Sequence, residues 1–193
     1  AKTRKETRFN GIYHLIYKEE TLRAAFMELK KNASSGVDGV SWTDYKADLD
    51  VNLKNLSQRL RNGAYRPLPV RRVHIPKADG KMRPLGVTAV EDKLVQAATA
   101  KVLNAIYEVD FLDFSYGFRP KRNQHQALDD LALKLNDRRV NWVFDADICG
   151  FFDAMKHDWL ITFVEHRIAD KRVVRLIKKW LKAGVFEDGN TSE

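Results

Sequence analysis

The sequence predicts a mixed α/β (α+β) fold that is rich in helices and has short antiparallel strands. Leucines recur at helical spacing over residues 49–60, which is typical of an amphipathic helix. Residues 70–75 and 82–87 are predicted to be two strands, and Asp79-Gly80 between them is a strong hairpin signal. Apolar and other residues alternate over 140–148, which predicts one more strand.

The first third of the chain is predicted to be helical. Residues 1–10 are predicted to form a flexible basic arm, residues 12–31 one or two helices, and residues 32–40 a loop. Ser41-Trp42-Thr43-Asp44 resembles a capping box, in which side chains satisfy the free N–H groups at a helix start. Gly63 suits the end of the helix that follows.

A second capping box is predicted at Thr88-Ala89-Val90-Glu91, opening a helix to about Ile106. Val185 to Glu193 is predicted to begin a strand with a turn at Asp188-Gly189, and its partner strand is expected beyond the end of the chain. The segments between are predicted to be an aromatic loop and three helices, over 111–120, 123–138, 158–168 and 171–183.

The segment Val140–Asp153 has the residues best suited to chemistry. Its alternation places Val143, Asp145 and Asp147 on one face of the predicted strand, opposite an apolar face. Two neighbouring carboxylates repel each other, and Mg²⁺ relieves that repulsion because it prefers oxygen ligands. The Gly150–Phe152 turn then offers a close backbone approach beside an apolar wall. The pattern predicts a site for metal and nucleotide.

The charge of the chain favours a polyanionic partner. The net charge is +8 and the isoelectric point is near 9.5. Nine basic residues face three acidic ones between Arg59 and Lys93, and smaller basic clusters lie at 2–8 and 119–122. This clustering indicates nucleic-acid binding, the alternative being a surface that is simply basic and soluble.

Length and composition favour a cytoplasmic protein. A chain of 193 residues is long enough for a real core, in one domain or two small lobes. No apolar run approaches the ~20 residues that span a bilayer, and no signal-peptide core is present, so no membrane partner is expected. Cys149 is the only cysteine, which excludes a disulfide framework and a cysteine zinc site.

A series of short motifs occurs in a fixed order from about Ile12 onward. Residues 147–153 have the form Asp-Ile-x-Gly-Phe-Phe-Asp. The other motifs are Ser35–Val40, Gly63–Pro67, Ile75–Gly86, Glu91–Gln96, Ser115–Pro120, His157–Leu160, Ala169–Arg172 and Trp180–Gly184. Together they resemble the reverse transcriptases, or maturases, that bacterial group II introns encode, and residues 147–153 resemble the first catalytic-aspartate motif of that family.

The resemblance implies a reverse-transcriptase-like fingers region and a partial palm. It implies an N-terminal extension with basic arm and loop over 1–40, and fingers with a basic hairpin over 41–95. The early palm then covers 96–155, and a helical pair with the start of a hairpin covers 156–193. The implied activity is RNA-directed DNA polymerisation, with intron RNA binding. The implied partners are an RNA template, intron RNA, a DNA primer and deoxynucleoside triphosphates.

The resemblance also implies roles at the catalytic site. It makes Asp147 the catalytic carboxylate, with Asp147 and Ile148 as the metal positions for Mg²⁺, or alternatively Mn²⁺. Gly150, Phe151 and Phe152 become nucleotide-binding residues, and the Phe152 ring would leave no room for a 2′-hydroxyl. The alternatives are a carboxylate that caps a turn at Asp147, and core aromatics at Phe151 and Phe152.

Basic residues complete the implied site. Lys77 and Arg83 flank the predicted hairpin turn and match the triphosphate-binding pair of the family, the alternative being a solvated hairpin tip. The predicted nucleic-acid contacts are Arg66, Arg71, Arg72 and Arg119. Arg71 and Arg72 face opposite sides of a strand, so they do not reach one ligand together. Arg119 could equally brace the fold by pairing with a carboxylate.

Two family motifs do not occur in the sequence. These are the second metal-binding motif, Tyr-x-Asp-Asp, and the Thr-Pro-Gln-Gly-Gly segment before it. The only Asp-Asp pair, Asp129-Asp130, falls on the outside of a predicted helix. The expectation is a chain that binds nucleic acid but does not polymerise by itself. The alternative functions are a non-enzymatic RNA-binding module and, with too few carboxylates, a metal nuclease.

Overall fold

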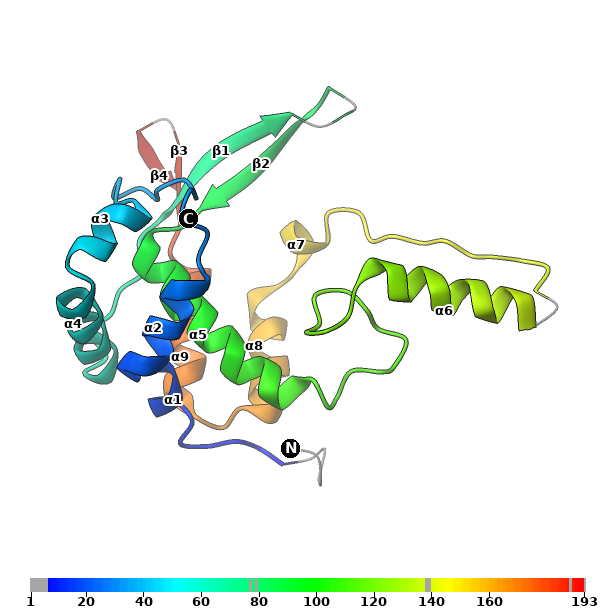
Figure 1. The fold of residues 1–193 in the computed structure, drawn as a ribbon, viewed down its shortest axis with the longest axis horizontal. Helices are drawn as coiled ribbons and strands as arrows, with labels where there is room; N and C mark the ends of the chain where they lie inside the picture. Colours follow the sequence, from blue (N-terminus) through cyan, green and yellow to red (C-terminus); the bar gives the residue numbers. More distant parts are fainter. Residues whose placement is uncertain (1–6, 77, 79, 138–139, 188, 193) are drawn as a thin grey trace.

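Helices form the body of the structure, a computed structural model that describes residues 7–192 apart from 77, 79, 138–139 and 188. Helix α5 (Val90–Tyr107) runs through its centre, with α1 (His14–Tyr17) and α2 (Glu19–Glu28) beside it, and α4 (Leu49–Arg61) packs against α1 and α2 (Figure 1). Helix α9 (Lys171–Leu181) completes the group. Their inner faces make the core, which includes Ile16, Leu22, Phe26, Leu53, Leu56, Leu60, Leu94, Val95, Val173 and Leu176.

The helices predicted in the first part of the chain are confirmed. Residues 12–31 contain α1 and α2, and the spaced leucines of α4 are buried at Leu53, Leu56 and Leu60. The Gly63 N–H donates to the Leu60 carbonyl at 3.0 Å just after the helix ends. Burial of one apolar stripe, more than helix propensity, explains why these short helices are stable.

The first predicted capping box is confirmed and the second is wrong. Ser41 caps α3 (Trp42–Ala47): its Oγ accepts from the Asp44 N–H at 3.2 Å, and its own N–H donates to the Asp44 carboxylate at 2.9 Å. Helix α5 begins after Ala89 without a side-chain cap. Glu91 instead accepts from the Arg59 guanidinium at 2.6 Å, a charge-assisted bond stronger than a cap.

A four-stranded mixed sheet lies at one end of the helical body (Figure 1). Strands β1 (Val70–Pro76) and β2 (Met82–Val87) form the predicted antiparallel hairpin, which projects from the body (Figure 1). Strand β3 (Val185–Glu187) pairs parallel with β1 and antiparallel with β4 (Asn190–Ser192), so the sheet order is β2-β1-β3-β4. The strand predicted from residue 185 exists, but the expectation of a partner beyond the chain is wrong, because both its partners belong to this chain.

The predicted strand over 140–148 is wrong. These residues are irregular and exposed, and the side chains of Trp142 and Phe144 are each 91% exposed. A strand needs a neighbour for its N–H and C=O groups, and among the described residues no strand pairs with this segment. Alternation predicts which residues would share a face of a strand, but it does not supply the partner strand.

Three further helices follow α5 in the chain. They are α6 (Gln124–Asp137), α7 (Phe151–Ala154) and α8 (His157–Arg167). Helix α6 confirms the prediction and extends away from the body together with the irregular segment after it (Figure 1). Across Gln124–Asp137, all of which the structure describes, no residue is buried. The short helix α7 was not predicted; a turn was expected there.

The N-terminal arm is less free than the sequence predicts. The Phe9 N–H donates to the Arg167 carbonyl and the Ala169 N–H donates to the Phe9 carbonyl, each at 2.7 Å, so Phe9 bridges to Ile168. The basic residues Lys2, Arg4 and Lys5 lie outside the described residues. No described helix is long and apolar enough to cross a membrane.

The loop 32–40 is held against the base of the hairpin. The Arg71 guanidinium donates to the Ser35 carbonyl at 2.7 Å, and the Lys93 ammonium donates to the Ser34 carbonyl at 2.9 Å. Gly36 lies so close to the start of α5 that a Cβ added there would be 2.5 Å from the Ala89 Cα. Only a glycine fits without moving the backbone.

We expect Gly36→Ala to lower the free energy of unfolding by about 1–2 kcal/mol, because the added methyl overpacks a rigid contact. Chemical denaturation of the two proteins measures the difference. Gly117→Ala is the matched control, since a Cβ at Gly117 meets nothing within 4 Å. Equal stability of the Gly36 variant and wild type would show that the loop moves freely to accommodate the methyl.

Candidate nucleotide and metal site

The predicted nucleotide and metal residues line one hollow. It lies between strand β2 and the segment around α7, and it measures about 830 Å³. Figure 1 shows α7 below the projecting hairpin. Lys77, the other predicted triphosphate contact, lies outside the described residues. The lining residues are Arg83, Pro84, Asp147, Ile148, Gly150, Phe151 and Phe152.

Asp147 is the carboxylate of this hollow. Both Asp145 and Asp147 are exposed, but only Asp147 lines the hollow. Ile148 beside it has a hydrocarbon side chain, so its backbone carbonyl oxygen is the only donor it has for a cation. The described residues contain no group of three or more His, Cys, Asp and Glu that could hold a metal ion. Mg²⁺ is often bound by one or two carboxylates together with substrate phosphates, and this donor set fits that pattern.

The aromatic wall beside Asp147 is formed by Phe151 and Phe152. Gly150 has a φ of +60°, a left-handed conformation that favours glycine, and it turns the chain into α7. The two rings that follow meet edge to face, with centroids 5.4 Å apart. The Phe152 side chain is 81% exposed, so it does not fill a core among the described residues. An exposed flat ring beside a carboxylate can pack against a sugar or base.

Strand β2 supplies the positive charge of the hollow. Arg83 lies opposite Ile75 in the antiparallel register and is exposed near the hairpin tip. Its guanidinium has the fork geometry that suits phosphate oxygens. Pro84 also lines the hollow and was not predicted. The signal for Pro84 was its place next to Arg83 inside the Ile75–Gly86 motif.

The four predicted nucleic-acid contacts do not gather at the hollow. Arg71 is committed to the Ser35 carbonyl, so it braces the loop 32–40. Arg119 is buried, pairs with Glu108 at 2.7 Å and donates to the Leu112 and Ser115 carbonyls, which is the bracing alternative. Arg66 is exposed and Arg72 is half-buried. These two remain available to a ligand.

A buried polar network fixes the base of the hairpin, and no sequence pattern predicted it. The Tyr65 hydroxyl donates to the Asp92 carboxylate, which also accepts from the Leu68 N–H at 3.0 Å. The Trp180 indole N–H donates to the Tyr65 oxygen at 3.1 Å. Burial raises the pKa of Asp92, although the bonds from Tyr65 and Leu68 oppose this. The network ties α5 and α9 to the chain that enters β1.

An exposed carboxylate, an arginine and an aromatic wall around one hollow suit an enzyme that binds a metal–triphosphate complex. The chain belongs to the reverse transcriptase family: the family described as "Reverse transcriptase (RNA-dependent DNA polymerase)" matches residues 75–193.

Individual relatives agree with this assignment. Protein YkfC of Escherichia coli (strain K12) is 40% identical over 195 residues, which covers 98% of this chain and 51% of YkfC. Group II intron-encoded protein LtrA of Lactococcus lactis subsp. cremoris is 35% identical over 181 residues, covering 93% of this chain and 30% of LtrA. The chain therefore spans about half the length of YkfC and less than a third of LtrA.

A solved structure shows the same fold. A chain of the "Cas6-RT-Cas1--Cas2 complex" superposes with a TM-score of 0.57 at 20% sequence identity, covering 93% of this chain and 18% of that one. The match confirms the predicted mixed α/β, reverse-transcriptase-like fold.

Proposed function

We propose that this chain forms the fingers and early palm of an RNA-directed DNA polymerase of the group II intron type. The hollow that gathers Asp147, Arg83 and Phe152 is the observation that carries the proposal. In this assignment residues 1–40 are an N-terminal extension, 41–95 the fingers and 96–155 the early palm. Residues 156–193 are a helical pair followed by a hairpin, which the strands β3 and β4 form.

Each residue predicted for the nucleotide and metal site has a chemical role in the proposal. Asp147, with the Ile148 carbonyl oxygen, holds Mg²⁺ or Mn²⁺, which when bound offsets the charge of the phosphates. Lys77 and Arg83 bind the triphosphate, since an ammonium and a guanidinium both pair with phosphate oxygens. Gly150 gives the backbone a close approach, and Phe151 and Phe152 form the wall against which a deoxyribose packs.

The proposed macromolecular partners are an RNA template, a DNA primer and the intron RNA. The printed name of LtrA, a group II intron-encoded protein, supports an intron partner. Arg66 and Arg72 are the predicted contacts that the structure leaves accessible. Contact with about six phosphates on a duplex predicts a slope near −5 in a plot of log affinity against log salt concentration.

Thermal unfolding with a deoxynucleoside triphosphate and Mg²⁺ tests the site. At about 100 times the dissociation constant we expect a stabilisation of about 2.7 kcal/mol, because only the folded chain binds the complex. Arg83→Ala should lose most of it, whereas the control Arg61→Ala, an exposed arginine outside the hollow, should keep it. Stabilisation that persists in Arg83→Ala, or without Mg²⁺, contradicts the assignment.

A non-enzymatic RNA-binding module is the second candidate. It is favoured by the net charge of +8 and by the nine basic residues that cluster between Arg59 and Lys93. A module of this kind binds RNA through charge alone, with the same salt dependence but without the Mg²⁺-dependent stabilisation by a triphosphate. The thermal experiment therefore separates the two functions.

A further inference from the structure

One face of helix α9 carries only positively charged side chains. Its sequence contains no acidic residue, and its opposite face is buried through Val173, Val174 and Leu176. Burial of that face fixes the direction in which the basic side chains point. The cationic face of α9, as we call it, consists of Lys171, Arg172, Arg175, Lys178, Lys179 and the residue after the helix, Lys182.

A solvated helix face normally mixes charges of both signs, and this one does not. Arg175 lies three or four positions from Lys171, Lys178 and Lys179, and like charges at these spacings destabilise a helix. The described carboxylates relieve little of the repulsion between these cations, because Asp170 pairs with Arg172 alone. Glu165 lies beside Lys171 and Arg175 without an ion pair to any described cation.

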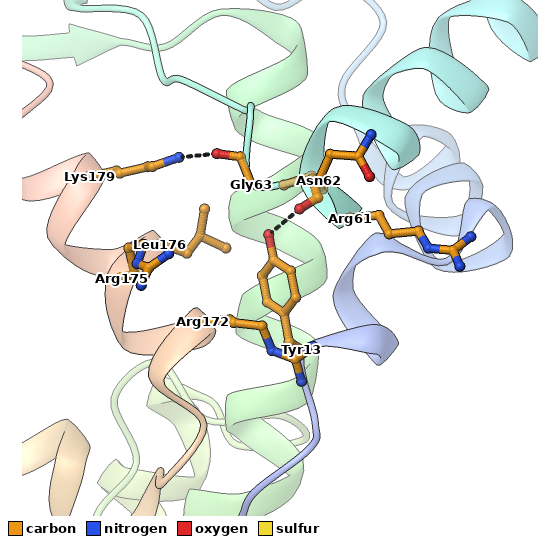
Figure 2. Close-up of a pocket in the computed structure, with 9 residues that line it drawn as sticks. Tyr13, Arg61, Asn62, Gly63, Arg172, Arg175, Leu176 and Lys179 are labelled. Carbon is orange, nitrogen blue, oxygen red and sulfur yellow. Dashed lines mark hydrogen bonds between the residues drawn. The ribbon is translucent and has the colours of Figure 1, made fainter.

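Arg175 lies between two hollows on the surface of α9. The first, about 180 Å³, lies between α9 and the end of α4 and is the pocket drawn in Figure 2. There Lys179 donates to the Gly63 carbonyl at 3.1 Å, and the Arg172 guanidinium lies 5.3 Å from the centre of the Tyr13 ring. The second hollow, about 240 Å³, is lined by Lys171, Val174, Arg175, Lys178 and Glu165.

The pKa of Lys179 is lowered, first by burial and then by nearby cations. Burial is the largest cause that lowers its pKa, and the cations Arg66 and Arg175 lower it further. Arg66 is therefore close enough to extend the cationic face of α9 beyond the helix, toward the chain that enters β1.

We infer that the cationic face of α9 binds the phosphate backbone of an RNA duplex, on a surface separate from the Asp147 hollow. The 11 residues of α9 span roughly 16 Å, a length over which a duplex presents about ten phosphate charges. The two surfaces share no lining residue. That the partner is RNA rests on the proposed function.

The chemistry of the face favours a duplex over a single strand. Proteins that bind single strands stack the bases on exposed aromatic rings. The aromatic residue of α9, Trp180, is half-buried and donates to the Tyr65 hydroxyl, so it offers no platform. A rigid row of cations without an aromatic ring contacts only the backbone, and a duplex presents its phosphates in a regular row.

Fluorescence anisotropy with an RNA duplex of about 16 base pairs, across a salt series, tests the inference on the 193-residue chain. We expect the variant Arg175→Gln/Lys178→Gln/Lys182→Gln to bind at least about tenfold more weakly at low salt, with a salt slope shallower by about 3. A single-stranded RNA should lose less than about threefold, since its binding also uses stacking. Removal of like charges relieves repulsion in α9, so the variant should fold at least as stably as wild type.

The matched control is Lys18→Gln/Lys30→Gln/Lys54→Gln, which removes the same charge from exposed positions on other elements. We expect its salt slope to change by less than about 1. A wild-type slope in the α9 variant, or an equal loss in the control, overturns the inference. An equal loss of affinity for single-stranded RNA would contradict the claim that the partner is a duplex. A DNA duplex that binds as tightly as the RNA duplex would contradict the claim that the partner is RNA.

The same proteins separate this inference from the proposed function. The α9 variant should keep the Mg²⁺-dependent stabilisation by a deoxynucleoside triphosphate, whereas Arg83→Ala should lose that stabilisation and keep duplex binding. If wild type shows no such stabilisation while the α9 variant loses the duplex, the proposed polymerase function fails and α9 remains a duplex-binding surface. If stabilisation is present and duplex binding is unchanged in the variant, only the inference about α9 fails.

Discussion

Asp147→Ala is expected to lower primer extension by about 1,000-fold or more in a reverse transcriptase that contains this chain together with the other family motifs. Asp147 is the carboxylate of the hollow, and a metal ion contributes several kcal/mol to phosphoryl transfer, with about 1.4 kcal/mol for each factor of ten. The rate of DNA synthesis on an RNA template measures the loss. RNA affinity should stay within a few fold, because the role proposed for the side chain is to bind metal and not RNA.

Asp145→Ala is the control for this experiment. Asp145 is exposed, lies two residues away and does not line the hollow, so its loss should change synthesis by less than about tenfold. Comparable losses in the two variants would point to a general effect of negative charge in this segment. Full activity of Asp147→Ala would remove Asp147 from the metal site.

Asp110→Ala is expected to lower the free energy of unfolding by about 3 kcal/mol, because it leaves a buried cation without its partner. Arg167 has a side chain that is only 3% exposed, and its Nη1 donates to the Asp110 carboxylate. Its Nε and Nη2 are buried without a hydrogen-bond partner among the described residues, so Asp110 is its main compensation. The loss is measured by denaturation with urea.

A double variant distinguishes the cost of an unpaired buried Arg167 from the net contribution of the Asp110–Arg167 ion pair to stability. Asp110→Ala/Arg167→Met replaces the buried cation with an apolar side chain, and we expect most of the lost stability to return, because apolar replacements of buried pairs are often neutral. The exposed pair Arg23–Asp50 is the reference, since Asp50→Ala should cost less than about 1 kcal/mol. Wild-type stability of Asp110→Ala would mean that water reaches Arg167.

Local patterns predicted the helices and the hairpin, and nonlocal partners explain the errors. The leucine spacing of α4 and the Asp79-Gly80 dipeptide act within a few residues, so their signal is in the sequence itself. Glu91 appeared to be a capping residue because its true partner, Arg59, lies far back in the chain. Apolar and other residues alternate over 140–148 as they do in a strand, but this pattern does not indicate whether a neighbouring strand is present.

The sequence predicted which residues belong to the candidate site better than it predicted how they are arranged in space. The residues from Asp147 to Phe152 came from one continuous motif, so the resemblance named them together, and the hairpin placed Arg83 beside them. The resemblance did not predict that Arg71 donates a hydrogen bond to the Ser35 carbonyl, because that bond depends on how the loop 32–40 folds back onto the hairpin. The basic residues of α9 were missed, although their spacing of three and four residues was a readable signal.

The parallel pairing of β1 with β3 has a consequence for how the chain acquires its structure. Val70 and Val185 become neighbours across a loop of roughly a hundred residues, and closing so long a loop is an entropic barrier that slows folding. The helical pair α1–α2 and the β1–β2 hairpin form from contacts near in sequence, so they can precede it. During synthesis on a ribosome, one edge of β1 therefore stays open until residues 185–187 emerge, and in that interval the hairpin is exposed to wrong pairing with other chains.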